Sequence, residues 1–179
     1  MRSAALIIGL AVGSVALAMP PVPRKAPEFT IVEPSGKETL LTSMKGKVVL
    51  IGFVATWCEH CQQFSQMLTK IQRDLGPRGF QAMDVAFNQG VTPAMVNEFV
   101  HRFGITFPVG YASPDTVMNY LGISLAERYV YPEVVIVDRK GIIRAQSPSS
   151  GDPNLQDEKY LRNLLEGLLK EGTGSAAKK

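Results

Sequence analysis

Residues 48–61, with the sequence VVLIGFVATWCEHC, join an apolar run directly to a pair of cysteines. The run from Lys47 to Val54 is almost continuously apolar, without the polar alternation of a strand that faces water on one side. Strands that are apolar on both faces lie in the middle of a sheet that helices cover on both sides. Residues 47–54 are therefore predicted to form a central buried strand.

The residues that follow the cysteines change to a helical period. Apolar side chains recur at the spacing of one helical face, at Phe64, Met67, Leu68, Ile71 and Leu75. Gly76-Pro77 ends this pattern, and Cys58 is expected at the start of the helix, with Cys61 one turn further on. Free amides and the helix dipole at a helix start favour a thiolate over a thiol. The predicted chemistry is attack by Cys58 on a disulfide and resolution by Cys61.

The other elements alternate along the chain. Strands are predicted at residues 80–87, in a hairpin at 134–137 and 142–144, and in a hairpin near the start at 29–32 and 38–41. Thr92-Pro93 and Ser113-Pro114 have the pattern of helix starts, and the leucines of residues 161–168 indicate a last helix. This order predicts an α/β sandwich with a mixed central sheet flanked by helices.

Both ends of the chain differ in composition from this domain. Residues 1–18 have the charged start, apolar core and small-residue end of a secretory signal peptide, with an uncleaved anchor as the alternative. Residues 19–26 are predicted to be a proline-rich linker, residues 27–171 the folded domain, and residues 172–179 a disordered tail. The expected location is extracytoplasmic, with the mature protein secreted or anchored by its N-terminus. We expect membrane contact only if the N-terminal segment is uncleaved.

Composition excludes several classes of function. The 179 residues are 45% hydrophobic and 20% charged, which suits a single globular domain. The formal net charge is +3 and the basic residues are scattered, so we expect no nucleic-acid partner. Two cysteines three positions apart make a poor structural staple and a good redox couple. His60 and His101 add too few ligands for a closed zinc site, so we expect no metal and no cofactor.

The segment Phe53–Cys61 resembles the active-site segment of the TlpA/ResA-type thioredoxin-like proteins of the bacterial envelope, in the AhpC/TSA–Redoxin superfamily. The resemblance continues through residues 26–29, 43–47 and 131–138, and it spans residues 26–145. It implies a thioredoxin-like three-layer sandwich with an added N-terminal β-hairpin. It also implies a periplasmic thiol–disulfide oxidoreductase of reductase type, which acts on protein thiols and disulfides with an envelope redox partner. Cytochrome c biogenesis is the role that the family suggests.

The resemblance also implies roles for residues around the cysteines. Pro132 is implied to be a cis-proline that faces Cys58 and Cys61, and an X-Pro bond directly before a buried strand is a plausible place for a cis bond. The neighbouring backbone, at Tyr131, is expected to pair with an extended substrate segment. Trp57 is expected to cover the thiol surface, with a plain core role as the alternative.

Two positions depart from the family pattern. Gly52 stands six residues before the first cysteine, where thioredoxins carry a buried acid and this family often carries asparagine. Phe64 stands where some reductive members carry a glutamate. A buried carboxylate near the resolving thiol helps that thiol lose its proton. Glu59, Glu133 and Asp84 are candidates to substitute, but each is expected to be a solvated or edge carboxylate.

The residues between the cysteines leave the direction of electron flow open. His60 resembles the histidine of oxidising members such as DsbA and protein disulfide isomerase, and an imidazolium near the Cys58 thiolate raises the reduction potential. Glu59 acts in the opposite direction. His101 lies beside Arg102 and is expected on the surface.

Three other functions stay open at the level of sequence. A peroxiredoxin shares the fold, but it needs proline and threonine or serine upstream of its cysteine, where Ile51 and Ala55 stand. A Sco-like copper-binding chaperone needs a wider C-x-x-x-C pair and a downstream histidine. A redox-dependent interaction module without turnover is compatible with the same residues.

Overall fold

The computed structural model describes residues 19–124 and 126–171. The predicted signal peptide and C-terminal tail lie outside these residues. The described residues form one eight-stranded mixed sheet in the order β1-β8-β7-β4-β5-β6-β2-β3. The strands are β1 (Arg24–Lys25), β2 (Thr30–Val32), β3 (Glu38–Leu40), β4 (Val48–Val54), β5 (Phe80–Ala86), β6 (Val109–Tyr111), β7 (Glu133–Val137) and β8 (Ile142–Gln146).

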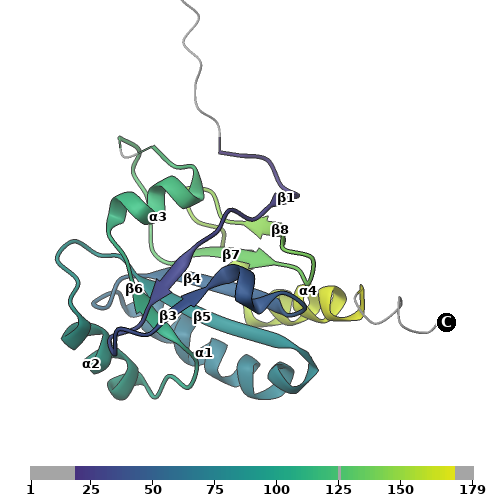
Figure 1. Ribbon diagram of the computed structural model, residues 1–179, viewed down its shortest axis with the longest axis horizontal. Helices are drawn as coiled ribbons and strands as arrows, with labels where there is room; N and C mark the ends of the chain where they lie inside the picture. Colours follow the sequence, from purple (N-terminus) through teal and green to yellow (C-terminus); the bar gives the residue numbers. More distant parts are fainter. Residues whose placement is uncertain (1–18, 125, 172–179) are drawn as a thin grey trace, which may run out of the picture.

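Helices cover both faces of this sheet (Figure 1). They are α1 (Glu59–Leu75), α2 (Pro93–Phe103), α3 (Pro114–Leu121) and α4 (Glu158–Glu171), with short 3₁₀ turns η1 (Leu41–Met44), η2 (Gly76–Arg78) and η3 (Asn154–Gln156). The apolar faces of α1, α2 and α4 pack into one core, and α3 packs into a second core on the opposite side of the sheet. The expected three-layer thioredoxin-like sandwich is confirmed. In the described ranges, we find no helix with the length and apolar character needed to cross a membrane.

Strand β4 is the centre of the sheet. It pairs in parallel with β5 and antiparallel with β7, and all seven of its residues are buried. Its alternate side chains serve the two cores, with Val48, Leu50 and Val54 on the α1 side and Val49 and Ile51 on the α3 side. Each fully buried aliphatic side chain contributes about 1.5–3 kcal/mol. The two-sided burial predicted from the apolar run is therefore present, and it fixes the end of β4 from which the cysteines follow.

The helix starts and the N-terminal hairpin follow the sequence pattern. The side chains of Thr92 and Ser113 accept hydrogen bonds from backbone amides in the first turns of α2 and α3. Strands β2 and β3 pair antiparallel, as the predicted hairpin requires. Strand β2 also meets β6, so the hairpin extends the main sheet.

Two short strands differ from the sequence-based expectation. Strand β1 lies within the segment expected to be a linker outside the domain, and it pairs antiparallel with β8. The Arg24 Nη2 atom donates to Oε1 of Gln146 at 2.6 Å, which ties this segment to the sheet. The sheet thus begins before the predicted domain boundary at residue 27. Strand β6, at Val109–Tyr111, was likewise not predicted. Neither β1 nor β6 is long enough to show an apolar period of its own, and both are ordered by pairing with neighbouring strands.

Candidate active site

The two thiols lie where β4 passes into α1. Cys58 is the N-cap residue of α1, and its Sγ accepts the backbone N–H of Cys61 at 3.3 Å. The same sulfur lies 3.9 Å from the carbonyl oxygen of Tyr131. Cys58 is 9% exposed and Cys61 is fully buried, and both are free thiols. A disulfide outside the protein can therefore approach only the sulfur of Cys58.

Burial raises the pKa of the Cys61 thiol well above its ordinary value, and the contact with Cys58 raises it further. The thiolate, and not the thiol, is the nucleophile in disulfide exchange. The Cys61 thiol must therefore lose its proton before its sulfur can act as a nucleophile.

An aromatic surface surrounds Cys58. The bond between Tyr131 and Pro132 is cis, and this loop faces the sulfur. The Trp57 side chain is 67% exposed, and its ring meets that of Tyr131 edge-on with the centroids 5.7 Å apart. Tyr131 also packs on Phe87, with 4.8 Å between ring centroids. The Trp57 side chain is therefore exposed to solvent next to Cys58, and the alternative that it is a plain core residue is wrong.

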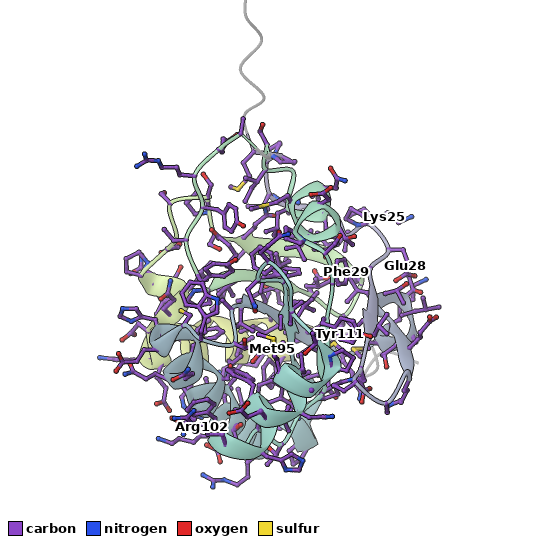
Figure 2. All side chains as sticks on the ribbon, turned by 90° about the vertical axis from the view of Figure 1, so that its left-hand side faces the viewer. Lys25, Glu28, Phe29, Met95, Arg102 and Tyr111 are labelled. Atoms are coloured by element: carbon purple, nitrogen blue, oxygen red, sulfur yellow. The ribbon has the colours of Figure 1, made fainter. Side chains whose placement is uncertain are left out.

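A groove of about 370 Å³ continues from Trp57 between the start of α1 and α2. It is lined by Thr56, Trp57, Gln62, Met95, Glu98, Phe99, Arg102 and Phe103. Exposed Arg102 and Glu98 are 3.9 Å apart at its rim, in an ion pair on the surface of α2. Figure 2 shows Met95 and Arg102 on the α2 side of the molecule, away from Lys25 and Glu28.

The residues between the cysteines point outward. Glu59 and His60 are exposed, and Glu59 accepts a hydrogen bond from Gln63 Nε2 at 3.4 Å. His60 lies at a shallow hollow that Gln156 also lines. His101 is exposed, as expected. In the described ranges, no three His, Cys, Asp or Glu side chains come together in a group that could hold a metal ion.

Asp84 differs from its expected environment. It was expected to be a solvated or edge carboxylate, but it is completely buried in β5. Its Oδ2 atom accepts a hydrogen bond from Ser65 Oγ at 2.5 Å, and its Oδ1 atom has no partner. Burial raises the pKa of Asp84 to about 7, and the Ser65 hydrogen bond partly opposes this rise. The expectation of a solvated or edge carboxylate is wrong because the Asp84 side chain points into the core, where the Ser65 hydroxyl is its hydrogen-bond donor.

Glu133 is the second correction. It begins β7 directly after Pro132, and it is buried instead of solvated. Its Oε2 atom accepts a hydrogen bond from Ser147 Oγ, and its Oε1 atom is unpartnered. Burial raises its pKa to about 7 as well. Two carboxyl groups that are easily protonated near neutral pH therefore flank the central strand, one on β5 and one on β7.

Gly52 explains how Asp84 fits. The two residues lie opposite each other in the parallel β4–β5 pair. A Cβ atom on residue 52 would lie 2.4 Å from Asp84 Oδ1 and 3.0 Å from Cε1 of Phe64. Both departures from the family pattern, Gly52 and Phe64, therefore border the space that Asp84 fills. Sequence reasoning missed the contribution of Ser65, for which the only signal is a polar residue on the apolar side of α1.

A dithiol at a helix start, opposed by a cis-proline loop on a mixed sheet, defines a thioredoxin-fold protein with a C-x-x-C site. The chain belongs to the AhpC/TSA family, whose model matches residues 22–146. This assignment and the similarity to ResA-type proteins confirm the family resemblance found in the sequence.

Individual relatives agree with this assignment. Thiol-disulfide oxidoreductase ResA of Geobacillus thermodenitrificans is 29% identical over 119 residues, which are 66% of this chain and 64% of that protein. The match thus covers less than two thirds of that relative. Thioredoxin-like protein YneN of Bacillus subtilis is 30% identical over 122 residues, 68% of each protein. The solved thiol:disulfide interchange protein from Chlorobium tepidum has a TM-score of 0.68 at 23% identity, covering 84% of this chain and 99% of that one.

Proposed function

We propose that this protein is a thiol–disulfide oxidoreductase that exchanges disulfides with partner proteins through Cys58 and Cys61. The observation that carries the proposal is the unequal pair of thiols, with one sulfur reachable at a helix start and the other buried directly behind it. A structural disulfide needs no such inequality, whereas a two-step exchange does, because an outer nucleophile must be followed by an inner resolving thiol.

In the reducing direction the Cys58 thiolate attacks one sulfur of a partner disulfide. A mixed disulfide forms, and the partner's other sulfur leaves as a thiolate. The Cys61 thiolate then attacks Cys58 Sγ, which closes the Cys58–Cys61 disulfide and releases the partner's second thiolate. Two electrons pass from the dithiol to the partner. The N–H of Cys61, 3.3 Å from Cys58 Sγ, supports negative charge on that sulfur before the attack.

The surface around Cys58 supports a polypeptide as the substrate. Exposed Trp57 offers a large apolar area at low entropic cost, and the adjoining groove with Met95 and Phe99 gives room for side chains that flank a substrate cysteine. The backbone at Tyr131 and Pro132 lies opposite the sulfur, where an extended segment would pair. These residues are our proposed substrate-binding surface.

We further infer that the protein acts as a reductase outside the cytoplasm, and that an envelope redox partner regenerates its dithiol. The signal-like composition of residues 1–18 and the family resemblance support this inference. On the same basis, protein disulfides such as the haem-attachment cysteine pairs of apocytochrome c are the proposed substrates.

The test is the reduction potential of the Cys58/Cys61 couple, measured together with insulin reduction and reduction of an oxidised C-x-x-C-H peptide. A potential near about −270 mV, as for thioredoxin, with turnover of both substrates is expected of a reductase. A potential near about −120 mV would assign the opposite direction. Full insulin reduction by a Cys58→Ala variant would overturn the redox function itself.

The peroxidase alternative is tested in parallel. Ile51 stands where a peroxidatic site needs proline and Ala55 where it needs threonine or serine, and both side chains are apolar and fully buried. We therefore expect consumption of hydrogen peroxide to be far slower than disulfide exchange. Peroxide turnover faster than insulin reduction would favour the peroxidase.

A further inference from the structure

A second cavity lies on the α3 side of the sheet, near the start of β4. It has a volume of about 170 Å³, and its wall includes Val49 and Val137, which are direct partners in the paired strands β4 and β7. Val49 precedes the end of β4 at Val54 by roughly 17 Å, at about 3.3 Å per residue. The cavity therefore lies at the opposite end of the central strand from Cys58. Among the described residues, it shares no wall with the groove beside Trp57.

Helix α3 does not reach this part of the sheet. It has eight residues, which span about 12 Å, whereas the seven residues of β4 span about 23 Å. Of the described residues that line the cavity, none belongs to α3. The segments 25–27 and 41–47 cover this end of the sheet instead, and Leu41 and Met44 pack into the same core as α3. The cavity is the space that remains between these segments and the strands.

Lysines surround the apolar wall of this cavity. They come from three separate segments of the chain, and all of them are exposed: Lys25, Lys45, Lys47 and Lys140. Within residues 19–124 and 126–171, none of the four takes part in a salt bridge. The ammonium group of Lys47 donates to a neutral partner, Gln81 Oε1, at 3.5 Å. The cavity therefore joins an apolar interior to four positive charges.

The carboxylates near these lysines have other partners. Asp138, which lines the cavity, accepts hydrogen bonds from two backbone N–H groups of its own turn and from Arg144 Nη1 at 3.2 Å. Glu171 acts electrostatically with Lys140, but its carboxylate forms an ion pair with Arg144. Glu28 accepts two backbone N–H groups. Five basic groups against three acids leave the surroundings of the cavity with a net positive charge, which attracts an anion.

Hydrogen bonds hold the lysine-bearing segments in place. The Ala26 N–H donates to the carbonyl oxygen of Gly141 at 2.9 Å. The Gly46 N–H donates to the carbonyl oxygen of Arg139 at 3.0 Å, and Arg139 Nη1 donates to the carbonyl oxygen of Gly46 at 2.7 Å. Both segments are thus bonded to the turn that carries the fourth lysine. A site whose backbone is already fixed loses less conformational entropy when a ligand binds.

We propose that this cavity binds a small organic carboxylate. The apolar part of the ligand lies against Val49 and Val137, and its negative charge lies among the lysine ammonium groups. Ligand sites in proteins typically combine an apolar wall with a few charged or polar groups that fix the orientation of the ligand. The volume of about 170 Å³ is close to the roughly 150 Å³ of an engineered cavity that holds benzene. The ligand therefore carries a single ring or a short branched chain.

The apolar wall distinguishes this ligand from two other anionic partners. A bare inorganic anion would leave the apolar wall of the cavity uncovered. A membrane surface of anionic lipids would contact the exposed lysines without entering the cavity. Both partners are outcomes of the experiment below, and neither uses Val49 and Val137.

Benzoate is the probe, because it has one ring and one carboxylate. Isotope-labelled full-length protein is titrated with sodium benzoate at pH 7 while NMR follows the backbone amides of lining residues such as Ala26, Lys45 and Gly141. We expect saturable shifts of these amides, whereas the amides of Trp57 and Cys58 keep their positions. Benzyl alcohol has the ring without the charge, and inorganic phosphate has the charge without the ring. Each is expected to bind at least about tenfold more weakly than benzoate.

A double variant tests the lysines. Lys45→Gln with Lys140→Gln removes two of the four charges at exposed positions, and we expect the dissociation constant for benzoate to rise about fivefold. Lys70→Gln with Lys159→Gln is the matched control, because these lysines are exposed on α1 and α4, outside the cavity, and the change in net charge is the same. The control should bind benzoate as the wild type does.

Three results would overturn the proposal: no saturable shifts at the lining residues, equal affinity for benzoate and for phosphate or benzyl alcohol, or equal losses in the two double variants. Sedimentation with phosphatidylglycerol vesicles tests the membrane. If the Lys45/Lys140 variant loses vesicle binding while benzoate leaves the wild-type amides unshifted, the lysines serve a membrane contact instead. Cys58→Ala should bind benzoate with wild-type affinity, so a failure of the proposed oxidoreductase function would leave this test unaffected.

Discussion

The site has an outer half that faces solvent and an inner half that does not. Cys58 and Trp57 form the outer half, and Cys61, Ser65 and Asp84 form the inner half. The two cysteines are three residues apart in one helix start, yet only the outer one is within reach of a substrate. The outer half depends on a local feature, the start of α1. The inner half depends on the register of β4 against β5, which places Gly52 opposite Asp84. The exposed and the buried parts of the site therefore depend on different parts of the fold.

The largest effect is expected from a substitution that removes the buried thiol and keeps the outer one. Cys61→Ser leaves Cys58 able to attack but removes the thiol that resolves the mixed disulfide. Catalytic reduction of insulin is expected to fall by at least about a thousandfold, because removal of an essential nucleophile commonly lowers kcat by that factor or more. A mixed disulfide with insulin should accumulate on a non-reducing gel.

Cys58→Ser is the matched control for this experiment. It keeps the buried thiol and removes the exposed one, so no mixed disulfide should form at comparable concentrations. Equal trapping by both variants would show that the inner sulfur is reachable, and the division into two halves would be wrong.

The next largest effect is expected at Gly52, which the register of β4 against β5 places opposite Asp84. Gly52→Ala places a methyl group 2.4 Å from Asp84 Oδ1, against a fully buried side chain. Overpacking of this kind costs about 1–3 kcal/mol, and we expect that loss in the free energy of unfolding measured by urea denaturation. Gly167→Ala in α4 is the control, since a Cβ atom there meets nothing within 4 Å. It should stabilise the protein by about 0.5–1 kcal/mol because glycine is unfavourable inside a helix.

The pH dependence of stability compares the two buried acids. Asp84 and Glu133 have folded-state pKa values of about 7, against unfolded values of about 3.9 and 4.3. Because the folded pKa is raised, the stabilising contribution is complete below about pH 4 and is lost as the pH rises through about 7. For Asp84 this difference corresponds to about 4 kcal/mol at most.

Asp84→Asn and Glu133→Gln should each flatten the fall in melting temperature between pH 4 and pH 8, relative to the wild type. A wild-type melting temperature that rises steadily through this range, with the same slope in both variants, would contradict the raised pKa values.

The smallest expected effect lies at the rim of the outer half. Trp57→Ala removes an aromatic side chain that is 67% exposed in the free protein and is proposed to contact the substrate. We expect KM for insulin to rise about threefold to tenfold, since one buried contact is worth on the order of 1 kcal/mol, with kcat changed less. Tyr160→Ala, at a tyrosine of α4 that is 45% exposed, is the control and should leave KM unaltered.

Local sequence signals predicted the central strand and the helices well. The apolar run of β4, the helical period after Cys61, and the N-caps at Thr92 and Ser113 are all properties of short segments, and each is present in the structure. Strand β1 was not predicted because two residues are too few to show a hydrophobic period. Their extended conformation comes from pairing with β8. The structure of a segment without a hydrophobic pattern depends on the segments that pack against it, and the sequence alone does not show which segments these are.

The burial of Asp84 likewise could not be predicted from its own segment of the sequence. Its neighbours in sequence are apolar, and a lone acid there has two interpretations, an edge carboxylate or a buried one. Gly52 gave a further signal, since a glycine in the middle of a buried strand marks a close approach by another group. The identity of that group depended on the strand register, which is a property of pairing between segments.

The amino-acid sequence by itself determined the central strand and the helix start that carries the two cysteines, because the hydrophobic period and capping act over a few residues. It also determined the family, through the segment from Phe53 to Cys61 and its flanking motifs. Only the tertiary structure decided that the Asp84 carboxyl is buried against Gly52, because parallel pairing of β4 with β5 brings together residues 52 and 84. Desolvation of a carboxyl group is a property of everything packed around it, and no single segment of the chain contains that information.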